Sequence, residues 1–179
     1  MVAGAPLLAM RAAGRYWRDE DASGRPRHGS VINTTSRSAL NAISPHGAYA
    51  AAKAAITTAS VVAAKEFAAF GARVNVVAPF ARTDMTKTVR GLAGRLGEDL
   101  DEGAFDPWVP DHVAPALAYL ATESCPLNGE VLYVHGGIVQ RYIGWQPGPG
   151  LDEEHAWSVE DLAVELPVAL GLDDGAHPQ

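Results

Sequence analysis

Three short apolar runs alternate along the chain with longer segments of helical period. The runs are Ser30–Thr35, Arg73–Ala78 and Glu130–Val134; they are rich in β-branched residues and bounded by Gly or Pro, which predicts three strands. Between the first two lies an Ala-rich segment, Ala48–Phe70, which predicts a long helix that ends at Gly71. Because an apolar strand reached through a long helix is typical of a right-handed crossover in a parallel sheet, this order predicts an α/β fold.

Further helices are predicted on both sides of these runs. Residues 2–18 and 111–122 have helical spacing, and residues 158–170 predict a short amphipathic helix. The polar, turn-rich stretch 18–28 is typical of a surface loop, and the Gly-containing segment 84–110 predicts an irregular excursion with short helices.

Composition excludes several classes of function. The 179 residues carry a net charge of −7, which argues against nucleic acid or an anionic membrane as the main partner. The lone Cys125 excludes an intrachain disulfide, and the histidines have no metal-ligand spacing. No apolar run is long enough to span a membrane. Because Arg11 and Arg15 interrupt the apolar beginning of the chain, we interpret it as a buried helix of a cytoplasmic protein and not as a signal peptide.

The residues most suited to catalysis are Ser36, Tyr49 and Lys53. Tyr49 and Lys53 lie four positions apart near the start of the long helix, so their side chains project from one face. An ammonium beside a phenol favours the phenolate, which makes Tyr49 a candidate proton donor or acceptor for a carbonyl or alcohol. Ser36 follows the first strand, where open α/β sheets bind ligands, and could hold the same substrate oxygen. The Tyr–Lys spacing alone is a weak signal. The same spacing in a long helix between two apolar strands is a much more specific pattern.

Four sequence segments resemble the short-chain dehydrogenase/reductase family. They are Val31–Ser36 (VINTTS), Tyr49–Ala55 (YAAAKAA), Arg73–Pro79 (RVNVVAP) and Leu127–Gly137 (LNGEVLYVHGG). The thirteen-residue step from Ser36 to Tyr49 also matches the catalytic spacing of that family. A softer resemblance, to the branch with hydroxyacyl-CoA and hydroxysteroid dehydrogenases, is carried by Gly103–Asp106 and by Gly144 with Trp145.

The resemblance implies a role for each of five residues. Tyr49 would be the general acid/base, Lys53 would bind the nicotinamide ribose and tune Tyr49, and Ser36 would polarise the substrate carbonyl. Pro79 and Thr83 would lie against the nicotinamide end of an NAD or NADP cofactor. The glycine that usually follows this proline is absent, and the resemblance does not distinguish NAD from NADP.

The chain departs from the family at its front. The family begins with a strand, a glycine-rich turn and a helix whose amino terminus holds the pyrophosphate, and neither these nor the catalytic asparagine is present. We therefore expect a partial Rossmann-type parallel sheet of about three strands flanked by helices, without the amino-terminal glycine-rich β-α-β unit. This region would span residues 1–146, followed by an extension, 147–179, with a short helix and a flexible tail.

Two functions follow as hypotheses. The first is an NAD(P)-dependent oxidoreductase that interconverts a hydroxyl and a ketone on an apolar or acyl-thioester substrate. The alternative is a truncated, catalytically inactive member that serves as a dimerisation partner. In this family the helices that correspond to residues 2–18 and 48–70 commonly pack across a dimer interface, so we expect a homo-oligomer or a hetero-oligomer with a full-length member. The strand at 30–35 would be an exposed edge, which favours assembly or poor solubility.

Overall fold

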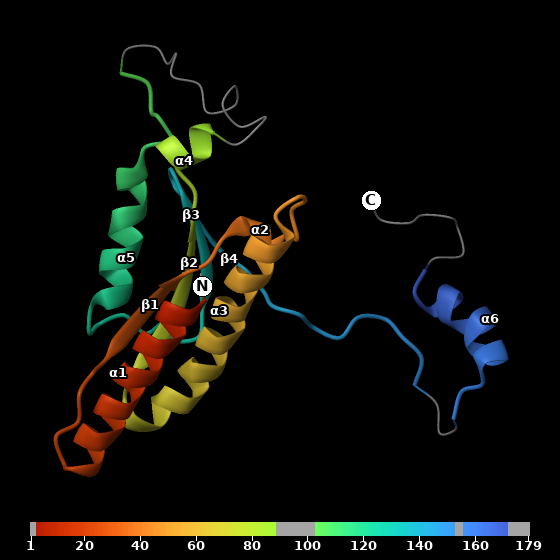
Figure 1. Ribbon diagram of the computed structural model, residues 1–179, viewed down its shortest axis with the longest axis horizontal. Coiled ribbons are helices and arrows are strands. Elements are labelled where there is room, and N and C mark those ends of the chain that lie inside the picture. The colour runs from red at the N-terminus through yellow and green to blue at the C-terminus, as the bar shows by residue number, and fades with distance from the viewer. Residues whose placement is uncertain (1–2, 89–102, 153–155, 172–179) are drawn as a thin grey trace. The chain divides into compact units, whose positions relative to one another are not determined.

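The three predicted strands form one sheet in the computed structural model, which describes residues 3–88, 103–152 and 156–171. The strands are β1 (Ser30–Thr34), β2 (Arg73–Pro79), β3 (Val131–His135) and an additional β4 (Ile138–Arg141), in the order β1-β2-β3-β4 (Figure 1). β1, β2 and β3 are parallel, and β4 pairs antiparallel with β3. The predicted α/β class is confirmed, and β1 lies at one edge of this sheet.

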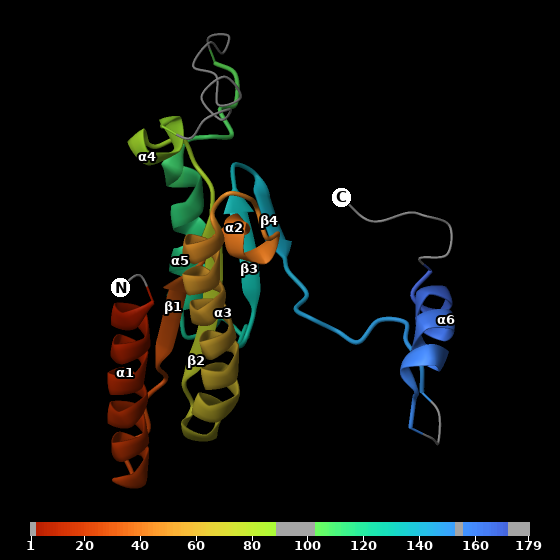
Figure 2. The same ribbon diagram turned by 45° about the vertical axis from the view of Figure 1, so that its right-hand side comes forward.

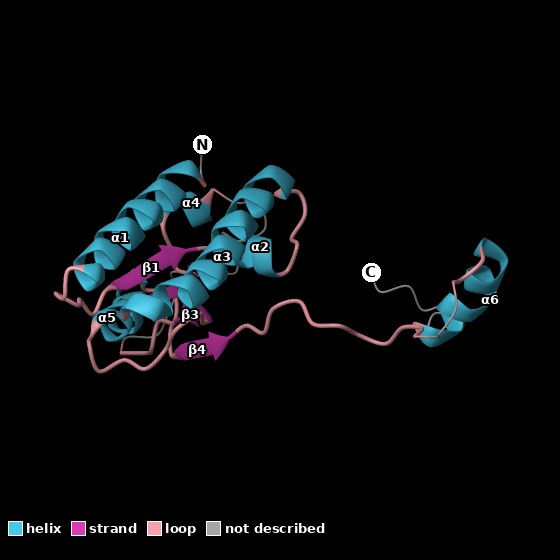
Figure 3. Ribbon diagram, turned by 90° about the horizontal axis from the view of Figure 1, so that it is seen from below, coloured by secondary structure: helices cyan, strands magenta, loops and turns pink. Residues whose placement is uncertain are grey.

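The helices cover both faces of the sheet. α1 (Gly4–Ala22) and α3 (Gly47–Phe67) lie side by side on one face, and α5 (Ala114–Ala121) lies on the other (Figures 2 and 3). Each face has its own apolar core. The core under α1 and α3 contains Met10, Ala63, Ala64, Phe67, Ala72 and Val74. The core under α5 contains Val77, Val113, Leu120, Cys125, Leu132 and Val134.

The sequence of the long helix α3 explains both its buried face and its end. Its buried residues recur at helical spacing and face the sheet, which stabilises the helix by burial of apolar surface. They are Ile56, Ser60, Ala63, Ala64 and Phe67. A 3-10 turn, Ala68–Phe70, continues the helix, and Gly71 then adopts a left-handed conformation with φ of 74°. The predicted end at Gly71 is therefore confirmed, because a residue without a Cβ adopts this conformation at little cost.

The first helix is longer than the sequence pattern predicts. Residues 18–28 were expected to form a loop, but α1 continues to Ala22. Glu20, on this last turn, accepts hydrogen bonds from Arg25 and Arg27, which hold the following segment against the helix. The hydrogen bond from Arg25 lowers the pKa of the Glu20 carboxyl below its ordinary value, and Arg27 lowers it further. A polar turn at a solvent-exposed helix end has no apolar period, so the pattern could not distinguish it from a loop.

Short elements account for the other differences. The expected helix at 111–122 is a 3-10 turn, Pro110–Val113, followed by α5. Two four-residue helices, α2 (Arg37–Leu40) and α4 (Asp84–Lys87), follow the carboxyl ends of β1 and β2. Of the segment expected to form an excursion, residues 89–102 lie outside the described residues.

The chain divides into two compact units, residues 1–143 and 144–179. In the second unit, α6 (Val159–Ala169) confirms the predicted amphipathic helix. The Oγ of Ser158 caps it by accepting a hydrogen bond from the Asp161 N–H at 3.0 Å. Within the described ranges, no helix has the length and apolar character needed to cross a membrane.

Candidate active site

The carboxyl end of β1 positions Ser36. β1 ends at Thr34, and Ser36 is the N-cap of α2 two residues later, with an extended backbone. Its Oγ accepts a hydrogen bond from the Ser38 N–H at 3.2 Å. The cap fixes the direction of the Ser36 side chain beyond the end of the strand.

Tyr49 and Lys53 come to the same end of the sheet on the first turns of α3. The Lys53 Nζ lies 5.9 Å from the centre of the Tyr49 ring. The same Nζ donates a hydrogen bond to the main-chain oxygen of Thr34 at 3.0 Å, so the ammonium lies directly at the end of β1. The structure therefore brings Lys53 next to both Tyr49 and the strand end that precedes Ser36.

A pair of threonines that the sequence pattern missed holds this arrangement. Thr35 is buried and its Oγ1 donates to the main-chain oxygen of Lys53 at 3.1 Å. The Thr57 Oγ1 lies 2.7 Å from the Thr35 Oγ1 and 2.9 Å from the Lys53 oxygen. These contacts tie α3 to the chain just before Ser36. The signal was the alternation along the strand, because Thr35 shares a face with Val31 and Asn33, and that face meets α3.

The two hydroxyls proposed for catalysis are available to a ligand. Tyr49 is 40% exposed, and Ser36 is half-buried. Within the described part of the chain, neither hydroxyl donates a hydrogen bond to another group. The Lys53 ammonium has three N–H groups, of which the Thr34 oxygen takes one.

Pro79 and Thr83 lie at the end of the neighbouring strand. Pro79 is the last residue of β2 and pairs with Val134 of β3. In place of the usual glycine, Phe80 continues the pairing, and its N–H donates to the Val134 oxygen at 3.0 Å. Thr83 is exposed and caps α4, where its Oγ1 accepts a hydrogen bond from the Thr86 N–H. Because β1 and β2 are parallel, their carboxyl ends lie at the same end of the sheet. Pro79 and Thr83 therefore lie at the strand ends that Ser36 also follows.

An aromatic cluster occupies the same edge of the sheet beside β3. It consists of Phe80, Trp108, Tyr133, His135 and Tyr142. The rings of Trp108 and His135 are stacked, with centroids 4.8 Å apart and planes inclined by 8°. Gly136 follows with φ of 53°, and a Cβ there would come within 2.9 Å of Pro107, so the turn after β3 requires glycine.

An ion pair between Arg82 and Asp106 borders this cluster. The Trp108 N–H donates to Asp106 Oδ1 at 2.9 Å. This hydrogen bond, together with Arg82, lowers the pKa of the Asp106 carboxyl below its ordinary value. The carboxylate therefore holds the segment that carries Trp108 against the end of β2.

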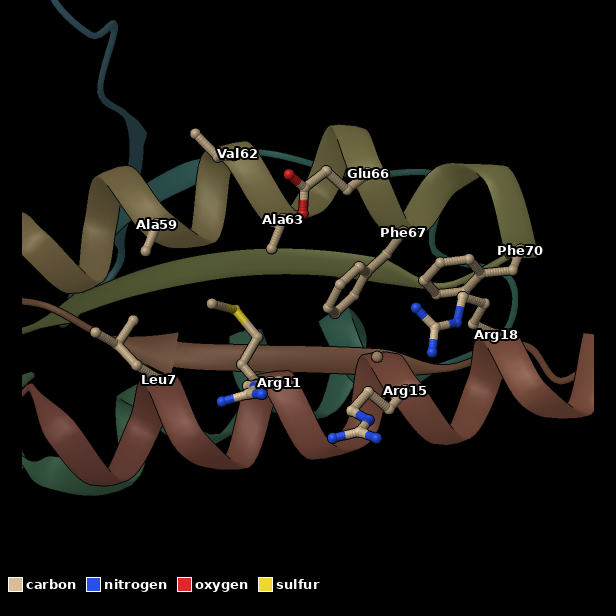
Figure 4. A pocket seen from close by; sticks show the side chains of 12 residues that line it. Leu7, Arg11, Arg15, Arg18, Ala59, Val62, Ala63, Glu66, Phe67 and Phe70 are labelled. Carbon is tan, nitrogen blue, oxygen red and sulfur yellow. The ribbon is translucent and has the colours of Figure 1, made fainter.

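A surface groove of the described structure lies elsewhere. It has a volume of about 800 Å³ and runs between α1 and the second half of α3 (Figure 4). Tyr49 lies on the first turn of α3 and does not line the groove. The floor of the groove is apolar and includes Phe67, while Arg11, Arg15 and Arg18 project along the α1 side. The groove shares none of its lining residues with the candidate catalytic trio of Ser36, Tyr49 and Lys53. Among the described residues, no group of three His, Cys, Asp or Glu side chains is placed to hold a metal ion.

A comparison with known protein families matches the part of the chain that contains the candidate site. A family model described as enoyl-(acyl carrier protein) reductase matches residues 5–139, which include the trio and all four strands except the last residues of β4. The chain belongs to the short-chain dehydrogenase/reductase family. The predicted family is therefore confirmed, together with its Rossmann-like, mostly parallel sheet.

Relatives within the family are similar over the same region. The hydroxyacyl-CoA dehydrogenase ChsB1 of Mycobacterium tuberculosis is 39% identical over 133 residues, which cover 73% of this chain and 41% of the relative. An NAD-dependent glycerol dehydrogenase of Listeria innocua is 33% identical over 115 residues, covering 61% of this chain and 44% of the relative. The crystal structure of a short chain dehydrogenase from Mycobacterium avium superposes with a TM-score of 0.74 at 34% identity, and covers 95% of this chain and 53% of that one. The chain spans about half the length of the relatives it matches.

Proposed function

We propose that this chain carries the proton-transfer half of an NAD(P)-dependent oxidoreductase that interconverts a hydroxyl group and a ketone. The observation that supports this proposal is the position of Lys53, whose Nζ lies 5.9 Å from the Tyr49 ring and 3.0 Å from the Thr34 oxygen. Two relatives named as a hydroxyacyl-CoA dehydrogenase and a glycerol dehydrogenase support the reaction type. The substrate would be apolar or an acyl thioester.

Each member of the trio has a defined task in this proposal. Tyr49 transfers a proton between its phenolic oxygen and the substrate oxygen, taking it during alcohol oxidation and returning it during ketone reduction. Lys53 stabilises the phenolate that remains after Tyr49 donates its proton. Ser36 donates its free O–H to the substrate oxygen and so stabilises the negative charge that develops there.

The residues present fit the nicotinamide end of a dinucleotide. Lys53 retains free N–H groups for a ribose hydroxyl, and Pro79 and Thr83 lie at the neighbouring strand end. The glycine-rich turn that would hold the pyrophosphate does not occur in this sequence. When bound, NAD or NADP supplies the acceptor or donor of the hydride.

Equilibrium binding tests this proposal. NADH and NADPH are titrated by calorimetry against the 179-residue chain, Lys53→Ala and Lys65→Ala; Lys65 is an exposed lysine on the same helix. We expect saturable binding that weakens at least about tenfold, or 1.4 kcal/mol, in Lys53→Ala and is unchanged in Lys65→Ala. Turnover of acetoacetyl-CoA is then measured, with and without an added full-length relative. Absence of both cofactor binding and turnover in every mixture would refute the proposal.

A second candidate function is that of a non-catalytic dimerisation partner, favoured by the groove between α1 and α3. Exposed apolar Val62 lies beside the groove's apolar floor, and Arg15 and Glu66 offer charges of both signs on its two sides. Such a surface could pair with a second copy of this chain or with a full-length member of the family. This would be assembly without turnover.

Sedimentation distinguishes the second candidate. The chain is measured alone and mixed with the full-length Mycobacterium tuberculosis relative, beside the variants Val62→Asp and Val139→Asp. Val139 is an equally apolar exposed residue, on β4, outside the groove. We expect an oligomer that Val62→Asp dissociates and Val139→Asp does not. A single monomeric species in both samples contradicts this function.

A further inference from the structure

Arg37 connects the catalytic trio to the aromatic cluster. It follows Ser36 in the chain and begins α2. Its guanidinium lies over the ring of Tyr133, with the Cζ 5.0 Å from the ring centre, and its Nη1 lies 3.4 Å from the Tyr133 Oη. The side chain therefore extends from the end of β1 across the end of β2 to β3.

The contacts to Tyr133 hold Arg37 without neutralising its charge. Tyr133 is 6% exposed and is itself packed against His135 and Tyr142. The face of an aromatic ring attracts a guanidinium above it, and this attraction limits the motion of the Arg37 side chain. In the described part of the chain, no acidic side chain lies within ion-pair distance of Arg37. The other N–H groups of this exposed side chain remain for a ligand.

Four other arginines of the described chain are held by acidic side chains or main-chain oxygens. Arg25 and Arg27 share Glu20, Arg141 pairs with Glu130, and Arg73 donates to main-chain oxygens near the end of α5. Arg37 instead presents a fixed positive charge next to Ser36 at the ligand-binding edge of the sheet. A planar guanidinium binds carboxylates and phosphates well, because two parallel N–H groups match two anionic oxygens.

We propose that Arg37 binds a carboxylate or phosphate group of the substrate whose hydroxyl or keto carbon lies at Ser36 and Tyr49. This assignment rests on the proposed oxidoreductase function. Of the substrates considered there, it keeps those that carry an anionic group and excludes wholly uncharged ones. The aromatic cluster contributes the surface along which the uncharged part of the substrate lies. Arg37 thereby determines specificity, and the proton transfer remains with Tyr49.

Binding of three small molecules tests the assignment and identifies the source of the anion. Acetoacetate carries a carboxylate, coenzyme A carries phosphates, and ethyl acetoacetate is a neutral ketone. Each is titrated by calorimetry against the chain, Arg37→Gln and Arg141→Gln. We expect the affinity for at least one anion to fall about tenfold in Arg37→Gln, which corresponds to about 1.4 kcal/mol. Arg141→Gln should bind the anions as tightly as the unaltered chain does. The affinity for the neutral ester should be the same in all three proteins.

Two further variants separate binding from structure. Arg37→Lys retains the charge but loses the planar fork, so its anion affinity should lie between those of the unaltered chain and Arg37→Gln. Tyr133→Phe removes only the hydroxyl partner of Arg37 and should lower the anion affinity less than Arg37→Gln does. Thermal unfolding followed by circular dichroism verifies that each variant is folded.

The outcomes separate this inference from the proposed function. Equal anion affinities in the chain and in folded Arg37→Gln, or no binding of either anion, overturn the role of Arg37. Anion binding that depends on Arg37 in a chain that neither binds NADH nor turns over a ketone supports the anion site and refutes the oxidoreductase proposal.

Discussion

The two ends of α3 serve different purposes. The end near Phe67 is packed: Ala63, Ala64 and Phe67 are buried, and a Cβ on Gly14 of α1 would come within 2.3 Å of the Phe67 ring. The end near Tyr49 is open to solvent and is held by polar contacts between Lys53, Thr57 and the strand. One end of the helix is therefore packed into the core, and the other end carries the candidate catalytic residues Tyr49 and Lys53.

The separation has a physical reason. Burial of apolar surface is the main favourable term in folding, but a buried phenol could not exchange a proton with a substrate. A long rigid helix lets the packed end hold the exposed end in place. Changes at the packed end should therefore alter the free energy of unfolding, and changes at the open end should alter ligand binding and catalysis.

The largest expected loss of stability is for Phe67→Ala. Removing a buried ring that packs on Gly14, Trp17 and Phe70 should lower the free energy of unfolding by about 3–5 kcal/mol. Urea unfolding followed by circular dichroism measures it. The control Phe70→Ala removes a ring that is only half-buried, and should cost less. Equal losses for the two rings would contradict the packed character assigned to Phe67.

A smaller effect is expected at the junction of the two ends, from Thr35→Val. The substitution keeps the shape of a buried side chain but removes the hydrogen bond to the Lys53 oxygen, and should cost about 1–3 kcal/mol. It should also weaken NADH binding, because one of the contacts that hold the Lys53 main chain at the strand end would be lost. The exposed Thr58→Val, on the same helix, is the matched control. If Thr35→Val lowers the free energy of unfolding but binds NADH as tightly as Thr58→Val does, the threonine contacts contribute to stability and not to the cofactor site.

The pH dependence around Asp106 should be more local. Its pKa is lower in the folded protein than its ordinary value of 3.8, so this carboxylate stabilises the fold above that value. The stabilisation is lost as the pH falls from there through the lowered pKa. Trp108 fluorescence between pH 6 and pH 2 should report the change, and Asp106→Asn should remove that part of the response. Identical titration curves for the two proteins would show that Asp106 does not contribute.

The smallest effect on stability is expected for Tyr49→Phe, which should change the free energy of unfolding by no more than about 0.5 kcal/mol, because the ring is 40% exposed. In any mixture in which the chain turns over a ketone, the same change should lower kcat by about 100-fold or more. Urea unfolding and steady-state kinetics on one preparation test the small change in stability and the large loss of kcat. A large loss of stability with little loss of turnover would reverse the roles assigned to the two ends of α3.

Local patterns predicted the long elements and the trio. Apolar β-branched runs gave the positions of β1, β2 and β3 within one or two residues, since buried parallel strands are apolar on both faces. α2 and β4 span four residues each, too short to show a period, and were missed. α4, equally short, lies in the segment 84–110 where short helices were expected. The roles of Ser36, Tyr49 and Lys53 stay predictions, although the structure places all three at one edge of the sheet.

The sequence by itself determined the α/β class, the family and the identity of the candidate catalytic side chains, because spacing along one helix and one strand is a local property. Only the tertiary structure decided which distant residues serve that site. Thr35 and Thr57 meet because β1 packs against α3, and Arg37 reaches Tyr133 because β2 and β3 are neighbours in the sheet. Contacts between residues far apart in the chain depend on the order of strands and the packing of faces, which no local pattern contains.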